Sequence, residues 1–325
     1  MTLLSLDNIP ALQSEVRALA AERGAVILAH NYQLPEVQDV ANFVGDSLGL
    51  SQQAAKTDAE VIAFCGVHFM AETASILSPD KTVLLPDPDA GCSLADSITA
   101  PQLRAWKAQH PDAVVVMYVN TTAEVKAETD YCVTSANAVQ VVEHIYREHG
   151  EGTEILFGPD MFLGAYVEKV TGRKMRVWDG ECHVHAGIRP GDIRDMRDSH
   201  PGADFLIHPE CGCSTSVMEY VAAGDVDPRG VHMLSTGGML GYAKDAPSGA
   251  TAIVATETGM LHPLREARPD VDFVAANEAA SCRFMKMITL PKLRDALREL
   301  APVVKVPGAV AERARLPIER MVAIG

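Results

Sequence analysis

Long apolar runs are missing from this chain of 325 residues. No run approaches the roughly 18 apolar residues that a helix needs to cross a membrane, although 47% of the residues are hydrophobic. The opening residues, MTLLSLDNIPALQ, also lack the basic segment and the cleavage site of a secretory signal peptide. We therefore expect a soluble protein that has no membrane partner.

Positive charge is also scarce. The chain has 28 Lys and Arg against 43 Asp and Glu, which gives a net charge of −15. It has no basic block and no alternation of basic with aromatic residues, so we expect no nucleic-acid partner. A small anionic substrate is still possible, because local hydrogen-bond donors rather than the net charge bind such a molecule.

The seven cysteines are an odd number and lack the regular spacing of a disulfide scaffold. A reducing compartment is therefore expected, and the cytoplasm is the natural one. The G-x-G-x-x-G and P-loop patterns are absent too, which argues against an enzyme that binds nicotinamide or nucleotide cofactors.

What the chain does contain is a threefold repeat centred on Cys92, Cys182 and Cys282, which are 90 and 100 residues apart. Each cysteine is followed by Ile at offset 6, by Leu or Ile at offset 11 and by Arg at offset 12, and a proline precedes the last two. These residues are Ile98, Pro101, Leu103 and Arg104; Ile188, Pro190, Ile193 and Arg194; and Ile288, Pro291, Leu293 and Arg294. Proline is tolerated in the first turn of a helix. Each copy therefore predicts a cysteine, a short loop and a helix, and the long period predicts a repeat architecture.

The segments before each cysteine repeat as well. Each unit opens with an apolar run that ends in polar or aromatic residues, namely VILAHNY, VVVMYVN and FLIHPE, and two further apolar runs follow. Stretches with helical spacing separate these runs, and such alternation predicts parallel sheets with crossover helices. We expect an α/β fold of three homologous three-layer units around a pseudo-threefold axis, with a central active site.

The expected divisions are an N-terminal helix over 1–22 and α/β units over 23–111, 112–201 and 202–325. The last unit includes a C-terminal helix and tail from Leu293. In the first unit, helical spacing predicts a helix from Pro35 to Val44. The GDSLG sequence at 45–49 matches the G-x-S-x-G nucleophile elbow, which needs a strand in that place. The predicted helix therefore argues against a serine hydrolase built on Ser47.

In parallel α/β sheets, ligands bind beyond the carboxyl ends of the strands. The polar residues expected there are His30, Tyr32, Tyr118, Asn120, His208 and Glu210. If the three units face one another, these side chains line one central site, and the three repeated cysteines converge on it. The other cysteines, Cys65, Cys132, Cys211 and Cys213, have no counterparts between units.

Three thiolates on one axis suit an iron–sulfur cluster that leaves one iron without a protein ligand. Such an iron is a Lewis acid for a substrate oxygen. A single cysteine is more often a small buried apolar residue. Zinc is the competing metal, bound by Cys182, His183 and His185 or by His208, Cys211 and Cys213. Neither of these sets has the paired spacing of a structural zinc site.

Hydroxyl residues occupy corresponding places before a helix in each unit, at Ser47, Ser135 and Thr236. They could serve only as helix N-caps. Three helix N-termini aimed at one cavity would, however, bind carboxylates or phosphate. Glu210, shielded from water, could have a pKa raised far enough for proton transfer near neutral pH, or it could be a solvated loop residue. His30 and His208 could donate hydrogen bonds to substrate oxygens.

Ten short motifs in order resemble the quinolinate synthase family, and the resemblance covers nearly the whole chain. They are AHNYQ at 29–33, GDS at 45–47, CGVHFMAETA at 65–74, PDPDAGCSLAD at 86–96, MYVNT at 117–121, TSAN at 134–137, WDGECHVH at 178–185, HPE at 208–210, STGGM at 235–239 and NEAASCRF at 277–284.

The resemblance implies three homologous α/β domains around one 4Fe-4S cluster per chain, with Cys92, Cys182 and Cys282 as ligands and an open iron that faces the substrate. It implies a transferase that condenses iminoaspartate with dihydroxyacetone phosphate to quinolinate, phosphate and water in de novo NAD biosynthesis, and a functional link to the oxidase or dehydrogenase that makes iminoaspartate. The implied substrate contacts are His30, Ser47, Tyr118, Asn120, Ser135, His208, Glu210 and Thr236.

The implied catalytic residues are Glu210 and Tyr118, which would move protons, together with His208 and Tyr32, the latter in a loop that closes over the site. A noncatalytic iron–sulfur redox protein or sensor is the alternative from a different class. Cys211 and Cys213 have no assigned place, and they could be structural, redox-sensitive or competing ligands.

Overall fold

Three four-stranded parallel sheets form the framework of the computed structural model, which describes residues 8–223 and 228–324. All three sheets have the same strand order, β2-β1-β3-β4, β6-β5-β7-β8 and β10-β9-β11-β12. The strands are β1 Ala25–His30, β2 Phe43–Gly45, β3 Val61–Cys65, β4 Thr82–Leu84, β5 Val114–Tyr118, β6 Tyr131–Val133, β7 Ile155–Gly158, β8 Arg176–Val177, β9 Asp204–Ile207, β10 Val231–Met233, β11 Thr251–Ala255 and β12 Asp272–Ala275. The predicted α/β fold of three homologous units is confirmed.

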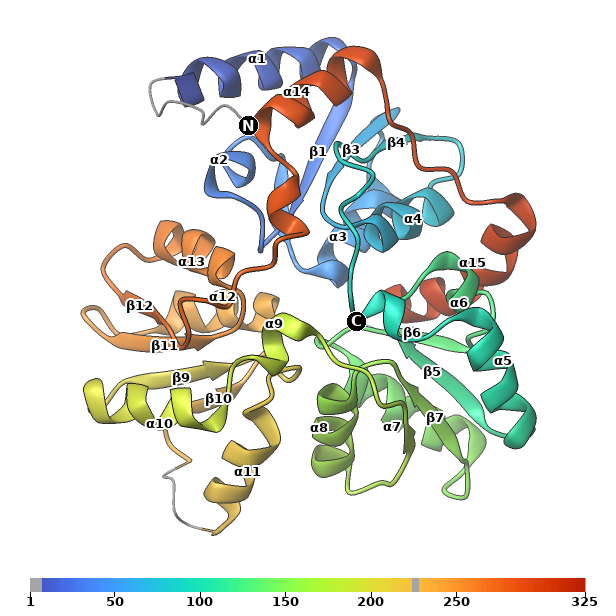
Figure 1. The fold of residues 1–325 in the computed structure, drawn as a ribbon, viewed down its shortest axis with the longest axis vertical. Coiled ribbons are helices and arrows are strands. Elements are labelled where there is room, and N and C mark those ends of the chain that lie inside the picture. Colours follow the sequence, from blue (N-terminus) through green and yellow to red (C-terminus); the bar gives the residue numbers. More distant parts are fainter. Residues whose placement is uncertain (1–7, 224–227, 325) are drawn as a thin grey trace.

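The units form three lobes around a common centre (Figure 1). Their inner strands β1, β5 and β9 are apolar runs buried almost throughout, as parallel strands covered by helices on both faces must be. The covering helices of the first two units are α2 Pro35–Gln38, α3 Ser47–Lys56, α4 His68–Leu77, α5 Ala100–Gln109, α6 Ala123–Lys126, α7 Ala138–His149 and α8 Met161–Thr171. The remaining ones are α9 His183–Ala186, α10 Pro190–Ser199, α11 Ser214–Ala223, α12 Thr236–Asp245 and α13 Leu261–Ala267.

The N-terminal helix α1 spans Ile9–Glu22 and buries Leu12, Val16 and Ala20. Its predicted range of 1–22 includes residues 1–7, which lie outside the described residues. The C-terminal segment forms two helices, α14 Leu290–Glu299 and α15 Gly308–Ala323, where one was expected. Within the described ranges, no helix combines the length and apolarity needed to cross a membrane.

The predicted helix from Pro35 to Val44 is wrong. Helix α2 ends at Gln38, and Phe43–Gly45 forms the edge strand β2 beside β1. Asn42 explains the change from helix to strand. Its N–H donates to the C=O of Ile27 at 2.9 Å, and its side-chain Oδ1 accepts from the N–H of Ile27 at 2.8 Å. Asp130 bonds Val115 of β5 in the same way, at 3.0 and 2.8 Å. Each sheet therefore gains a short edge strand, at β2, β6 and β10, that periodicity did not predict.

The strand β2 gives GDSLG the strand-then-helix setting that a nucleophile elbow requires. Ser47 does follow a strand and begins a helix, α3, so the reason given against a serine hydrolase fails. The pairing that such chemistry needs is nevertheless not formed, since within the described ranges the Ser47 hydroxyl makes no hydrogen bond to a histidine. The elbow pattern alone carries no hydrolytic function here.

Packing explains the repeat around the cysteines, because the segment after each cysteine packs on the sheet of the next unit. In the first copy, Ile98 and Leu103 share an apolar cluster with Val115, Met117 and Leu156 of the second sheet.

The second copy behaves in the same way. Ile188 and Ile193 pack with Phe205, Ile207 and Ile253 of the third sheet.

The third copy packs on the first unit, where α14 contacts α1 and β3 of the first sheet (Figure 1). The residues at offsets 6 and 11 are thus anchors that hold each cysteine loop between two sheets. The exact bounds of the three units stay a prediction.

Replacement of Leu293 by alanine tests this anchoring. Leu293 is fully buried in α14, so the cavity should lower the free energy of unfolding by about 2–5 kcal/mol. Urea denaturation followed by circular dichroism measures the effect. Glu299→Ala, on the exposed face of the same helix, is the control and should change the midpoint little. An unchanged midpoint in Leu293→Ala would show that α14 is not an anchor.

Candidate active site

One pocket lies where the carboxyl ends of the inner strands of all three sheets meet. His30 ends β1, Tyr118 ends β5, and His208 follows β9. All twelve residues that the sequence suggested as cluster ligands, substrate contacts or catalytic groups line this pocket: His30, Tyr32, Ser47, Cys92, Tyr118, Asn120, Ser135, Cys182, His208, Glu210, Thr236 and Cys282. The expected convergence of the three units on one site is therefore observed.

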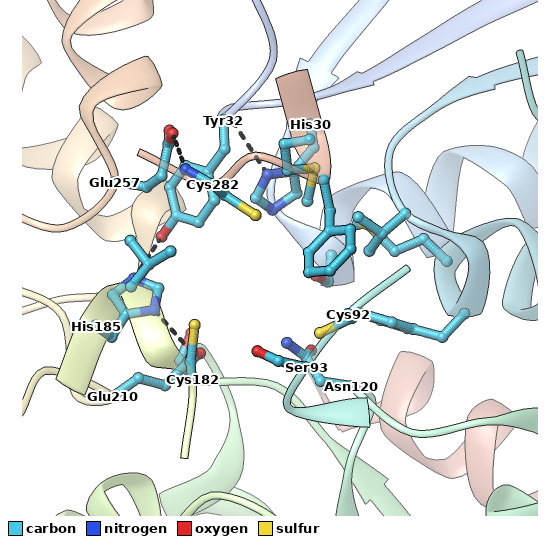
Figure 2. Close-up of a pocket in the computed structure, with 18 of the residues that line it drawn as sticks. His30, Tyr32, Cys92, Ser93, Asn120, Cys182, His185, Glu210, Glu257 and Cys282 are labelled. Carbon is cyan, nitrogen blue, oxygen red and sulfur yellow. Dashed lines mark hydrogen bonds and ion pairs between the residues drawn. The ribbon is translucent and has the colours of Figure 1, made fainter. Parts of the chain in front are cut away.

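The sulfurs of Cys92, Cys182 and Cys282 point into this pocket from three separate loops (Figure 2). Burial raises the pKa of the Cys92 thiol, and the nearby Cys182 and Cys282 raise it further. The pKa of Cys282 is raised as well, chiefly by burial. Three buried thiols this close to one another can all lose their protons only when a cation compensates the negative charge. The three cysteines therefore fit a metal centre that prefers sulfur ligands.

The other four cysteines, Cys65, Cys132, Cys211 and Cys213, are fully buried outside the pocket. Cys211 and Cys213 pack with Phe205 and Ile207 in the core of the third unit, and both are free thiols. The structure therefore favours a packing role for this pair.

Carboxylates occupy equivalent positions beside two of the cysteine loops, and one of them, Glu257, holds its loop by a hydrogen bond. The Cys282 N–H donates to Glu257 Oε1 at 2.9 Å, and Lys286 Nζ lies 3.0 Å from the same oxygen. In the second unit the equivalent residue is Asp160, which accepts from the N–H of Leu163 at 2.7 Å and whose other carboxylate oxygen is buried without a hydrogen-bond partner.

The equivalence of these carboxylates comes from the backbone. The residue after each carboxylate donates its N–H to a backbone C=O two residues before the cysteine. The two bonds are Met161 to Gly180 at 2.8 Å and Thr258 to Ala280 at 2.9 Å. In the first unit His68 bonds Ala90 in the same way at 2.7 Å, but the residue before it is Val67. The Cys92 loop therefore has an apolar residue where the other two units have a carboxylate.

His185 is a site residue that the sequence suggested only as a possible zinc ligand. Its Nε2 lies 2.9 Å from Thr256 Oγ1 and 3.2 Å from the Tyr32 hydroxyl, and its Nδ1 lies 3.2 Å from Glu210 Oε2 (Figure 2). The ring stacks on that of His208, with 4.8 Å between the centroids. His185 therefore joins Tyr32 and Glu210, which come from different units.

Glu210 is 2% exposed, so it is not a solvated loop residue, and the expected rise of its pKa is wrong. Burial alone would raise the pKa of this carboxyl, but the charge of the neighbouring His185 outweighs burial and lowers it to about 2. In spite of its own burial, the pKa of His185 is raised well above its usual value by Tyr32, Cys182 and Glu210. The Tyr118 hydroxyl donates a hydrogen bond to Glu210 Oε1. Burial and this carboxylate raise the pKa of Tyr118 well above its usual value. The pair is thus an ionised base beside a protonated phenol.

The two histidines at the strand ends are both neutral donors. Burial lowers the pKa of His30 to about 3 and that of His208 to about 4. In each ring Nδ1 accepts a backbone N–H, from Tyr32 at 3.1 Å and from Glu210 at 3.4 Å. These bonds assign the proton to Nε2 in both rings. The Nε2 of His208 lies 3.1 Å from Ser135 Oγ, so both rings can donate to substrate oxygens.

The three hydroxyls are not helix caps. Asp46 caps α3 by accepting from the Gly49 N–H at 2.8 Å, and Ser235 caps α12. Ser47 and Thr236 are the first residues of these helices, and Ser135 lies two residues before Asn137, the N-cap of α7. The three hydroxyls therefore border the pocket at the start of α3 and α12 and just before α7, which suits anionic groups.

The zinc sets proposed from the sequence are not formed as written. Cys182 lies near His185 and Glu210, with one donor atom of each within 4.8 Å of the others. His183 turns to Ser93 instead, with its Nδ1 2.6 Å from the hydroxyl. Sequence reasoning did not predict Asp160, Thr256 or Glu257, which lie beside the cysteine loops or His185. It named His185 only as a possible zinc ligand, from the HVH sequence after Cys182.

Comparison with known proteins gives consistent results. The family model described as quinolinate synthetase A protein matches residues 14–323. A quinolinate synthase from Mycobacterium sp. (strain KMS) is 57% identical over 313 residues, which cover 96% of this chain and 91% of that protein. A quinolinate synthase from Thermus thermophilus is 56% identical over 315 residues, 97% of this chain and 98% of that protein. One from Mycobacterium tuberculosis (strain H37Rv) is 56% identical over 321 residues, 98% of this chain and 90% of that protein. With this coverage, and with ten motifs that meet in one pocket, the chain belongs to the quinolinate synthase family.

Proposed function

We propose that this protein condenses iminoaspartate with dihydroxyacetone phosphate to form quinolinate, phosphate and water, as a transferase of de novo NAD biosynthesis. The observation that carries the proposal is the convergence of three thiols, two neutral histidines and three hydroxyls from all three units on one pocket. Protein purified without oxygen should be brown and should form quinolinate from the two substrates. Brown protein that forms no product would contradict the proposal and favour a sensor.

The proposed cofactor is one 4Fe-4S cluster per chain, held by Cys92, Cys182 and Cys282. Three soft donors from three loops fit a cluster with one iron free of protein ligands. When bound, that iron supplies Lewis-acid chemistry to a substrate hydroxyl or carboxylate. A thiolate-held cluster is stable in a reducing compartment, and we therefore propose the cytoplasm as the location.

The protein's own residues bind and orient the two anionic substrates. Phosphate and carboxylates would lie at the N-termini of α3, α7 and α12, where Ser47, Ser135 and Thr236 add hydroxyls. The Nε2–H groups of His30 and His208 would donate to substrate oxygens. These local donors bind anions in spite of the net charge of −15.

Proton transfer falls to the groups beside the substrate space. The Glu210 carboxylate can remove a proton from a substrate carbon or nitrogen, and Tyr118, which donates to it, can return a proton to the leaving oxygen. Tyr32 contacts Thr256 at 2.6 Å and His185 at 3.2 Å, which holds its phenol at the pocket. A partner oxidase or dehydrogenase would supply the iminoaspartate.

Replacement of Glu257 by alanine should weaken the cluster without unfolding the chain. The variant loses the acceptor for the Cys282 N–H, a charge-assisted bond that contributes about 1.5–3 kcal/mol. The ordered state of the loop should therefore become roughly 10- to 150-fold less favoured. Iron and sulfide contents after anaerobic reconstitution, and the decay of cluster absorbance in air, measure the effect.

Glu278→Ala is the matched control, because Glu278 is exposed in the same loop. It should keep the wild-type cluster content and decay rate. If Glu257→Ala behaved like this control, the carboxylate would have no part in holding the loop.

A further inference from the structure

We propose that the cluster-free chain binds one Zn²⁺ ion through Cys182, His185 and Glu210, at a site that shares a single cysteine with the proposed cluster. Within residues 8–223 and 228–324, this is the one group of three Cys, His, Asp or Glu side chains whose donor atoms converge in this way. The inference goes beyond the proposed function, since neither the reaction nor the cluster requires it.

The spacing of the donors is close to that of zinc ligands. Ligand atoms about 2.0–2.3 Å from a tetrahedral zinc ion are roughly 3.3–3.7 Å apart. His185 Nδ1 and Glu210 Oε2 are 3.2 Å apart, so this pair already has the required separation. The Cys182 sulfur lies within 4.8 Å of both, and a side-chain movement of about 1 Å closes the set.

The surroundings of His185 prepare the ring for a metal. Thr256 Oγ1 at 2.9 Å and the Tyr32 hydroxyl at 3.2 Å both contact Nε2, which can donate its proton to either oxygen. Zn²⁺ would bind the Nδ1 lone pair in place of a proton, and this buried nitrogen has no hydrogen-bond partner, because its contact with Glu210 at 3.2 Å is an ion pair and not a directed bond. Metal-binding histidines are usually oriented in this way, through the nitrogen that does not bind the metal.

Glu210 is prepared in the same manner. Tyr118 donates to Oε1, which fixes the carboxylate and leaves Oε2 facing His185. A thiolate and a carboxylate together neutralise Zn²⁺, so the ion would compensate the charge of a carboxylate that is only 2% exposed. Three protein ligands leave the fourth position for water, and this position would face the pocket.

Zinc and the cluster would exclude each other because both need the Cys182 thiolate. The zinc-loaded chain should be colourless, and it should not accept iron and sulfide until a chelator removes the zinc. Zinc bound to these donors would therefore hold the protein in a cluster-free state.

The test titrates Zn²⁺ into the full-length, reduced, cluster-free protein in competition with a chromophoric chelator. The expected result is one ion per chain. His185→Ala should weaken binding at least roughly 100-fold, and Glu210→Gln should weaken it too. Cys92→Ala and Cys282→Ala should bind within about threefold of the wild type. Co²⁺ replaces Zn²⁺ as a spectroscopic probe and should show a thiolate charge-transfer band that Cys182→Ala abolishes.

Two results would overturn the inference. One is the absence of stoichiometric binding. The other is equal loss of affinity in Cys92→Ala, Cys182→Ala and Cys282→Ala, which would place zinc on the three cysteines. Thermal unfolding of each variant confirms that it is folded. A chain that assembles the cluster and forms quinolinate but binds no zinc would refute this site and leave the proposed function intact.

Discussion

Cys182→Ala is expected to give a folded, colourless protein that makes no measurable quinolinate, even after anaerobic reconstitution with iron and sulfide. The three sulfurs reach the pocket from three loops (Figure 2), so no neighbouring cysteine is available to replace a missing one. Cys211 and Cys213, the nearest in sequence, are fully buried in the core of the third unit. Cys92→Ala and Cys282→Ala should have the same effect.

Iron and sulfide contents and the visible absorbance of the reconstituted variants provide the measurement. Cys65→Ala and Cys132→Ala are the controls, because these cysteines are buried outside the pocket. They should keep the cluster, although the lost core volume will lower stability. A normal cluster in Cys182→Ala would remove that residue from the ligand set.

Glu210→Gln is expected to keep the brown colour and lower kcat by roughly 10²–10⁴-fold, the usual contribution of a general base. The substitution preserves the size of the side chain and an oxygen that can accept from Tyr118, but it removes the ionised base. The low pKa of Glu210 means that the wild-type carboxylate is ionised throughout the neutral range. Weaker substrate binding alone would instead raise KM and leave kcat unchanged.

Steady-state assays with both substrates, together with the absorbance spectrum of the cluster, separate these effects. Glu219→Gln on α11 is a suitable control, because its side chain is 74% exposed. It should match the wild type in rate and colour. A rate for Glu210→Gln within about threefold of the wild type would exclude Glu210 as the base.

The repeat predicted the main features of the site for a physical reason. Residues at offsets 6 and 11 from each cysteine are buried because they anchor a loop on the next sheet, as Ile98 and Leu103 do on β5 and β7. The burial constrains their identity, so the pattern is visible in the sequence. The cysteines repeat at the same offset, and a threefold arrangement of equivalent loops then brings them to one centre.

The features that the sequence did not reveal depend on tertiary contacts. The edge strand β2 has only three residues, and the apolar residues around it also fit helical spacing. Its pairing with β1 is decided by Asn42, which bonds Ile27 across the sheet. The low pKa of Glu210 depends on His185 from another unit, and no local pattern indicates that contact.

The carboxylates beside the cysteine loops were missed for a different reason. Asp160 and Glu257 are equivalent by their backbone hydrogen bonds, but the first unit has Val67 in the same place. A comparison of the three units by sequence therefore shows no shared residue type at this position. Only the structure shows that Glu257 holds the Cys282 loop and that Asp160 occupies the equivalent place beside the Cys182 loop.

The most direct measurement is an anaerobic crystal structure with an anomalous map for iron. We expect one compact group of four irons per chain in the central pocket, bonded to the sulfurs of Cys92, Cys182 and Cys282, with one iron that has no protein ligand. Iron located anywhere else, or a fourth protein side chain bound to the cluster, would contradict the account.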